Sequence, residues 1–282
     1  MSPHAYASGN YTPVREERAL SPCRVSGIVP KELAGGMYVR NGSNPNVPVH
    51  APGNGKPRPY HWFDGDGMLQ GVFFSPAAAA PAAPAAPPSF VNRYVLTDIN
   101  LATSTLASSP ILPSIATLLG PVWLLPMVVC SVLRAVFLAA RSFATMYPVR
   151  RLSVANTSVL WHDGRALVGC ESGPLGWVRL PALETVGWWD LEGDEGEMGM
   201  RAKGGVLGWM KEWTTAHPKL DPVTGELVLF HSQMLPPYLS YSVNPSTQYG
   251  TASTPRITSA PVPLCKLATS VVVVCSPDQN RC

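Results

Sequence analysis

The sequence predicts an all-β protein of short antiparallel strands, and three observations support this fold class. The 30 prolines and 24 glycines are spread through 282 residues, which keeps regular elements short and favours strands joined by turns over long helices. Runs of β-branched and aromatic residues alternate with turn sequences such as Asn-Gly and Asp-Gly. These runs recur at the spacing expected of propeller blades, without a strict repeat. With 46% hydrophobic and 14% charged residues, the chain is apolar enough to bury a large core.

The first strands surround an Asp-Gly turn. A Gly-Gly turn precedes residues 37–40 (MYVR), which predict a strand. Residues 60–63 (YHWF) and 68–74 (MLQGVFF) are separated by DGDG, a pattern typical of a β-hairpin. The alternating residues 90–96 predict the strand that pairs with this hairpin. Between them, residues 76–88 hold five prolines and eight alanines, a composition that predicts a loop insertion.

An apolar insertion follows at residues 111–143. Its first 23 residues carry no charge and are long enough to cross the ~30 Å hydrocarbon layer as a helix. Pro113, Pro121 and Pro126 would each remove a backbone hydrogen bond, and an amphipathic tail with two arginines follows. We therefore expect a helical segment lying in a membrane interface, with a buried helix or a true span as alternatives. The side chains expected to enter the interface are Trp123, Leu124, Leu125, Val128, Val129 and Phe137.

Strand patterns return after the insertion. Residues 158–161 and 166–170 flank Asp163-Gly164 and predict a second hairpin. Further short strands are expected at residues 177–180, 185–188 and 226–230.

Charge and cysteine usage narrow the partners and the compartment. The formal charge is only +3, and no basic run is long enough to follow a phosphate backbone, so nucleic acid is not an expected partner. Six cysteines occur without a CxxC pair, which suits a reducing compartment. The first residues lack the features of a signal peptide. We expect a cytoplasmic protein that associates peripherally with membranes.

Four blocks, in order, resemble the carotenoid oxygenase family: GNYTPV (9–14), VSGIVPKELAGGMYVRNGSNP, YHWFDGDGM and TAHPKLDPVTGEL. The resemblance implies a seven-bladed β-propeller whose axis holds one Fe(II) on four histidines. Neutral imidazoles suit Fe(II), and four of them leave two octahedral positions open. Residues 1–282 are then expected to form one incomplete propeller domain. The chain ends in an atypical tail at 264–282.

The resemblance assigns His217, in the triplet HPK, as the first iron ligand. It also places Glu171 where the family has a glutamate that orients a ligating imidazole through its outer N–H. The other histidines are interpreted as structural: His162 as an exposed residue beside a turn, His231 as a packing residue and His61 as part of the first hairpin. His4 and His50 lie in polar loop sequence.

The reaction implied by the family is insertion of dioxygen across one alkene bond of a carotenoid or apocarotenoid, at a membrane surface, with two carbonyl products. No histidine follows His231, so the other three ligands are missing and the chain is expected to be truncated, to lose Fe(II), to be inactive and to hold no catalytic residue of its own. Cleavage of stilbene-type alkenes is a related alternative, disfavoured because residues 90–100 offer no lysine for a phenol. A non-enzymatic membrane- or carotenoid-binding module and a single-pass membrane protein are the remaining alternatives.

Overall fold

The computed structural model describes residues 5–47, 60–76, 86–106, 110–114, 125–189, 213–232, 239–246 and 258–261. The described strands form three antiparallel sheets of four strands each. The first sheet has the order β1-β4-β3-β2, with β1 Arg18–Pro22, β2 Met37–Asn44, β3 Asp66–Phe73 and β4 Ser89–Tyr94. The second has the order β5-β6-β7-β8, with β5 Ser158–His162, β6 Arg165–Gly169, β7 Gly176–Arg179 and β8 Glu184–Trp188. The third has the order β12-β11-β10-β9, with β9 Lys219–Leu220, β10 Leu227–Ser232, β11 Leu239–Asn244 and β12 Thr258–Pro261.

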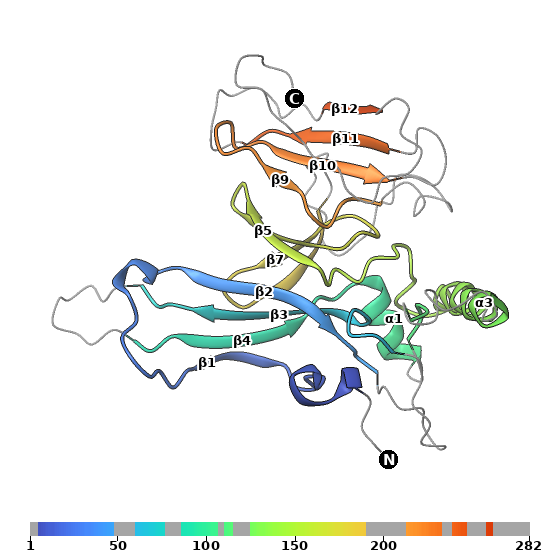
Figure 1. Cartoon of the computed structure of the whole chain (residues 1–282), viewed down its shortest axis with the longest axis horizontal. Helices are drawn as coiled ribbons and strands as arrows, with labels where there is room; N and C mark the ends of the chain where they lie inside the picture. Colours follow the sequence, from blue (N-terminus) through green and yellow to red (C-terminus); the bar gives the residue numbers. More distant parts are fainter. Residues whose placement is uncertain are drawn as a thin grey trace.

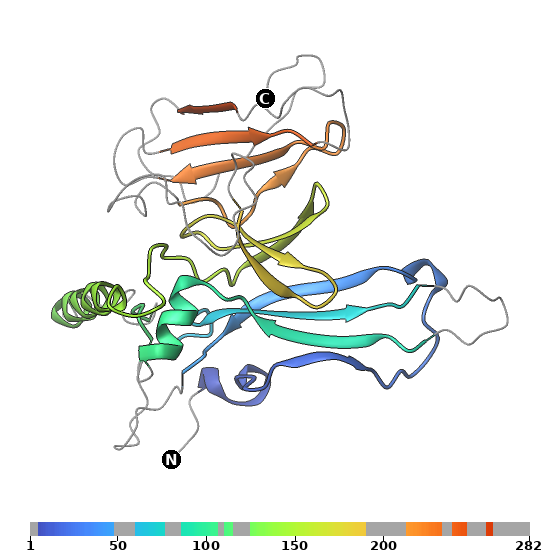
Figure 2. The same cartoon turned by 180° about the vertical axis from the view of Figure 1, so that it is seen from behind.

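The three sheets follow one another along the molecule as successive blades. Figure 1 shows β1–β4 at the bottom, β5–β8 in the middle and β9–β12 at the top, and the reverse view in Figure 2 keeps this order. The prediction of short antiparallel strands is confirmed. The total of seven blades stays a prediction. The loop insertion at 76–88 and the tail at 264–282 also stay predictions, because most of the first segment and all of the second lie outside the described residues.

The predicted first hairpin is wrong. Residues 60–64 form a turn, not a strand, because Asp64 folds back on His61: its backbone N–H donates to His61 O at 2.9 Å, and its carboxylate accepts from the His61 backbone N–H at 2.7 Å. The strand after the turn, β3, instead pairs along its whole length with β2, from Met37↔Phe73 to Asn44↔Asp66. On its other edge β3 pairs with β4, which confirms the strand predicted at 90–96.

The second predicted hairpin is confirmed. β5 and β6 pair in register from Ser158↔Gly169 to His162↔Arg165. The two turn residues both have positive φ, 49° at Asp163 and 79° at Gly164, as a two-residue hairpin turn matching the strand twist requires.

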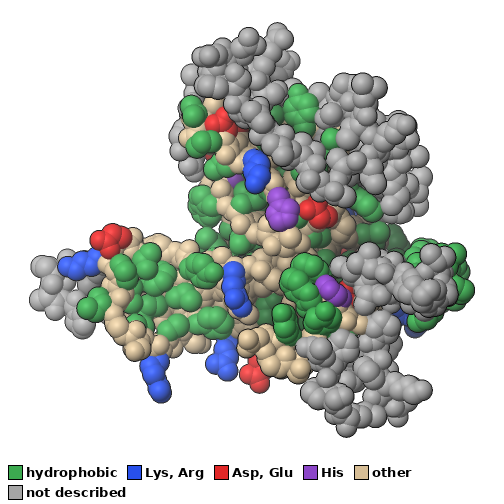
Figure 3. Space-filling view, in the orientation of Figure 1, with side chains coloured by type: hydrophobic (Ala, Val, Ile, Leu, Met, Phe, Trp, Pro, Cys, Tyr) green, Lys and Arg blue, Asp and Glu red, His purple; other side chains and the backbone are tan. Residues whose placement is uncertain are grey.

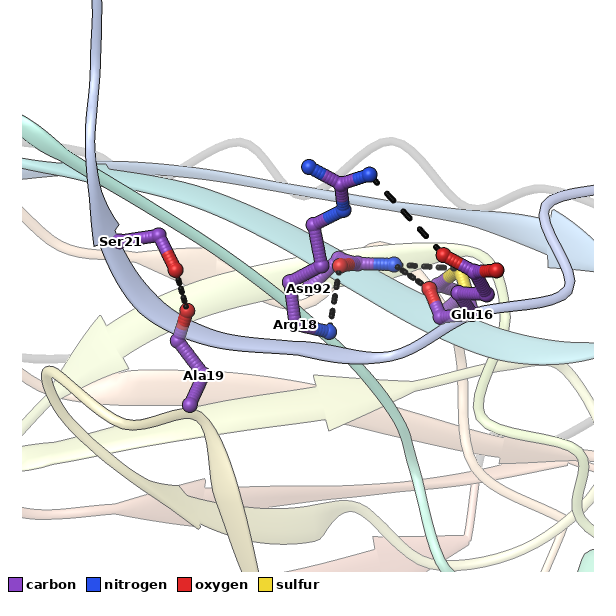
Figure 4. Close-up of polar contacts among 6 residues, drawn as sticks. Glu16, Arg18, Ala19, Ser21 and Asn92 are labelled. Atoms are coloured by element: carbon purple, nitrogen blue, oxygen red, sulfur yellow. Dashed lines mark hydrogen bonds and ion pairs between the residues drawn. The ribbon is translucent and has the colours of Figure 1, made fainter.

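The edge strand β1 was not predicted from the sequence. It is exposed along its length, so it lacks the alternation that marks a half-buried strand. It is held by the buried Asn92 of β4, whose side chain accepts from the Arg18 backbone N–H at 2.9 Å and donates to Glu16 O at 2.8 Å (Figure 4). The Arg18 guanidinium also lies 3.9 Å from the Glu16 carboxylate.

The described residues include the α-helices α1 and α3 beside the sheets, so the fold class is β-rich rather than purely all-β. Helix α1, Asp98–Leu106, was not predicted; it buries Ile99 and Ala102. Thr97 caps its start by accepting the Asn100 N–H at 3.1 Å. Asp98 ties the helix to the rest of the fold, because its carboxylate accepts hydrogen bonds from the backbone N–H groups of Arg150 and Arg151 at 3.0 and 2.9 Å and from Trp188 Nε1 at 3.1 Å.

Helix α3, Leu125–Ser142, confirms the helical part of the apolar insertion. It stands away from the sheets at one end of the molecule (Figures 1 and 2). Leu138 and Ala139 face the body of the protein and pack on a cluster that includes Ile99 and Val149.

The main core joins the first two sheets. Leu69 of β3, Val91 of β4 and Val168 of β6 are all 0% exposed and belong to one cluster. The contact is close: a Cβ at Gly67 would lie 2.2 Å from the carbonyl oxygen of Ala155, and the Gly67 N–H donates to Val154 O at 2.8 Å. The glycine in DGDGM is therefore required by backbone approach between the sheets.

Candidate functional site

The segment that carries His217 lies along β10. Thr214 forms an isolated antiparallel bridge with His231, and the Thr215 N–H donates to Phe230 O at 2.9 Å. Thr215 and Ala216 are buried at 1% and 0% exposure, whereas the His217 side chain is 67% exposed. The His217 N–H donates to Thr215 Oγ1 at 3.0 Å. The buried residues hold the backbone, and the imidazole projects from it.

Glu171 comes from the second sheet, directly after β6. The preceding residue, Cys170, is buried at 4% exposure, with its thiol 3.3 Å from Ser153 Oγ. The Ser172 hydroxyl donates to Leu152 O at 2.7 Å. These contacts on both sides of Glu171 anchor the backbone, while its carboxylate stays 57% exposed.

The structure brings these two predicted residues together. His217 Nε2 lies 3.9 Å from Glu171 Oε1, although the residues come from different sheets and are far apart in sequence. This distance is within ion-pair range and too long for a direct hydrogen bond. A modest movement of two exposed side chains would close it. The described residues contain no group of three or more His, Cys, Asp or Glu side chains placed to hold a metal ion.

The other described histidines are His61, His162 and His231. His162 is buried at 3% exposure, with Nε2 lying 3.4 Å from the Asn244 side-chain amide of β11, so the prediction of an exposed residue is wrong. His231 makes side-chain hydrogen bonds to Thr214 and Ser242 and is more than a packing residue. His61 lies in the turn before β3. His4 and His50 lie outside the described residues.

The sequence interpretation missed an aromatic cluster around the first turn. Trp62 and Phe63 stack with ring centroids 3.8 Å apart, and His61 contacts both rings. Tyr6 and Tyr11 from the N-terminal segment complete the cluster, at 5.1 Å from His61 and 6.4 Å from Trp62. The adjacent residues 60–63 (YHWF) are the signal for this cluster in the sequence, although their pattern predicts a strand.

Comparison with known proteins shows the family. The family model described as retinal pigment epithelial membrane protein matches residues 11–272. The chain belongs to the carotenoid oxygenase family. Carotenoid dioxygenase carX of Gibberella fujikuroi is 45% identical over 256 residues, covering 86% of this chain and 36% of that protein. The chloroplastic 9-cis-epoxycarotenoid dioxygenase NCED1 of Oryza sativa subsp. japonica is 33% identical over 243 residues, covering 86% and 33%. The chain therefore spans about a third of the length of these relatives.

Solved structures of this family share the fold. Lignostilbene dioxygenase from Pseudomonas brassicacearum superposes with a TM-score of 0.58 at 23% identity, covering 92% of this chain and 43% of that chain. A variant of the apocarotenoid oxygenase of Synechocystis gives a TM-score of 0.52 at 18% identity, covering 89% and 44%. These likenesses support the assignment of the three sheets to a β-propeller fold.

The family implies a ferrous ion, and the donor chemistry of His217 and Glu171 fits it in part. An exposed neutral imidazole is a suitable Fe(II) ligand, and a carboxylate within reach of one ring nitrogen can fix the tautomer. The described residues supply one such imidazole near one carboxylate and no complete ligand set.

The surface of α3 is the second candidate functional feature of the chain. α3 is the one described helix that is long and apolar enough to cross a membrane, and only 6% of it is buried. Of the predicted interfacial residues, Leu125, Val129 and Phe137 are 59%, 48% and 63% exposed, and Val128 is half-buried. Trp123 and Leu124 lie outside the described residues. Figure 3 shows hydrophobic side chains gathered at the end of the molecule that α3 occupies.

Proposed function

We propose that the protein is an Fe(II)-dependent dioxygenase that cleaves one alkene bond of a carotenoid or apocarotenoid and yields two carbonyl products. The observation that carries this proposal is the 3.9 Å approach of His217 Nε2 to Glu171 Oε1 across two sheets. An exposed imidazole paired with a carboxylate on rigidly held backbone is the arrangement that a metal-binding histidine needs. The carotenoid substrate class is supported by the names of the relatives at 45% and 33% identity.

In this proposal His217 binds the ion and Glu171 orients the imidazole. When Glu171 accepts the N–H of one ring nitrogen, the lone pair of the other nitrogen is free for the metal. An iron ion held there would supply the chemistry of dioxygen activation. A single imidazole holds Fe(II) weakly, so the described residues alone are not expected to retain the ion.

Iron and substrate are tested together on the purified protein supplied with Fe(II), β-carotene in detergent micelles and ¹⁸O₂. Two carbonyl products in the mass spectrum, each carrying one labelled oxygen, would support the dioxygenase and contradict the expectation that the chain is truncated and inactive, whereas no product would agree with that expectation. The His217→Ala variant should lose the product, and Glu171→Gln should reduce it. Turnover of resveratrol in place of carotenoids would favour the stilbene alternative, and carotenoid binding without turnover would favour a binding module.

We also propose that the outward face of α3 docks on a lipid bilayer. The helix is attached to the body through Leu138 and Ala139, and its Arg134 guanidinium donates to Pro110 O at 2.9 Å. A spanning helix would have to give up these contacts, whereas a helix lying in the interface keeps them and buries its exposed apolar side chains in lipid. The same location would give access to substrates dissolved in the bilayer.

Liposome flotation tests the docking surface with two matched variants. Phe137 on α3 and Tyr38 on β2 are aromatic side chains with similar exposure, 63% and 61%. Phe137→Glu should reduce the bound fraction several-fold, because a carboxylate replaces an inserted ring, whereas Tyr38→Glu should leave binding unchanged. Equal binding by both variants and the wild type would refute the role of α3.

A further inference from the structure

We propose that His231 is a positioning residue that fixes the His217 segment through hydrogen bonds from its imidazole to Thr214 and Ser242. This inference rests on the proposed role of His217 as a metal ligand. His231 has no assigned part in that role, and the sequence suggested only a packing residue. Its side-chain contacts indicate a more specific task.

The His231 imidazole joins three chain segments. On one side, Nδ1 lies 3.0 Å from Thr214 Oγ1, in the segment that leads to His217. On the other side, Nε2 is hydrogen-bonded to Ser242 Oγ of β11. His231 itself belongs to β10, which pairs with β11 along its length. The ring therefore ties a short, bridge-paired segment to a rigid two-strand ladder.

The chemistry of the three groups suits a permanent link. A neutral imidazole has one donor and one acceptor nitrogen, and a hydroxyl can serve as either, so both contacts are satisfied in either tautomer. Burial lowers the pKa of His231 to about 4, which keeps the ring neutral at physiological pH. Ser242 is itself buried at 2% exposure, so neither contact competes strongly with water.

The link is transmitted to His217 through a short series of hydrogen bonds. Next to the Thr214 contact, the Thr215 N–H donates to Phe230 O at 2.9 Å, in the residue before His231. Thr215 Oγ1 then accepts the His217 N–H at 3.0 Å. Since the His217 side chain is 67% exposed, these hydrogen bonds, together with the buried Thr215 and Ala216, hold its backbone in place.

Two substitutions separate this role from simple packing. The Asn side-chain amide reproduces the position of Nδ1, and the Gln amide reproduces Nε2. His231→Asn therefore keeps the hydrogen bond to Thr214 and loses the one to Ser242. His231→Gln keeps the hydrogen bond to Ser242 and loses the one to Thr214. Thr214→Val removes the hydrogen bond between Thr214 and His231 Nδ1 without changing side-chain shape. It replaces His231→Gln in the test if that variant fails to fold. His162→Gln, a buried histidine of the second sheet, is the matched control.

Backbone amide exchange of the 282-residue chain, measured by NMR, is the first measurement. His231→Gln and Thr214→Val should accelerate exchange at Thr215 and His217 by about tenfold or more. His231→Asn should stay nearer to the wild type at these two amides, and His162→Gln should leave them unchanged. Equal acceleration by the Asn and Gln variants, or none in either, would overturn the proposal, because packing alone does not distinguish the two ring nitrogens.

Anaerobic titration with millimolar Fe(II) is the second measurement, read as paramagnetic broadening of the His217 ring signals. His231→Gln should need several-fold more Fe(II) than the wild type for the same broadening. If His231→Gln shows faster amide exchange at Thr215 and His217 but the same Fe(II) titration as the wild type, the positioning role is overturned. Absence of broadening in the wild type would overturn the iron assignment and the positioning role with it, while the exchange data would still report whether the hydrogen-bonded link exists.

Discussion

Asp66 should make the protein less stable as the pH rises through 6. Its side chain is 6% exposed at the start of β3. Burial raises the pKa of Asp66 from 3.8 to about 6, an effect that the facing Asn100 amide only partly offsets. At neutral pH the carboxylate is therefore ionised in a site that favours the neutral acid.

The magnitude follows from the displacement of the pKa. A rise from 3.8 to about 6 corresponds to about 3 kcal/mol of preference for the protonated form in the native state. Because the native pKa is above the unfolded one, this stabilisation is fully present below pH 3.8 and is lost as the pH rises through 6. Asp66→Asn, which cannot ionise, removes this pH dependence and keeps the size of the side chain.

Urea unfolding of the wild type and Asp66→Asn at several pH values measures the difference in unfolding free energy. The wild type should lose about 2 kcal/mol relative to the variant between pH 4 and 7, since part of the full effect lies below pH 4. Asp221→Asn is the control of opposite sign, because hydrogen bonds from Val223 and Thr224 lower the pKa of this exposed carboxyl. A difference between wild type and Asp66→Asn that is independent of pH would refute the reasoning.

Three further stability changes follow from the contacts described above. Gly67→Ala should lower the free energy of unfolding by about 3 kcal/mol or more in urea titrations, because its Cβ would lie 2.2 Å from a backbone oxygen. Gly42→Ala on the neighbouring strand is the control: a Cβ there has no atom within 4 Å, so the variant should be as stable as the wild type or slightly more stable. Leu69→Ala should lower the unfolding free energy by about 3 kcal/mol, because the side chain is 0% exposed in the core; a loss below about 1 kcal/mol would contradict this packing. Asp98→Ala should cost about 2 kcal/mol by thermal unfolding and Asp98→Asn less, since the amide retains one accepting oxygen; equal losses would argue against the hydrogen bonds as the cause.

Local pattern was sufficient for most of the strands and one hairpin. β5 and β6 are joined by an Asp-Gly turn whose φ values suit a two-residue connection, so neighbouring residues determine that pairing. The same reasoning failed for the DGDG turn. There the Asp64 carboxylate closes a turn upstream, and the partners of β3 come from distant segments.

The candidate site depended on both kinds of information. The four sequence blocks, one of which contains His217, indicated the family, and the resemblance then pointed to His217 and Glu171. Their 3.9 Å approach, the burial of His162 and the link through His231 depend on how the sheets pack, and the packing of residues far apart in sequence leaves no periodic trace in the chain. The sequence by itself therefore determined most of the strands, the apolar helix and the family, because turn chemistry and hydrophobic period are local properties. Only the tertiary structure decided which residues meet, because those contacts join separate strands and sheets.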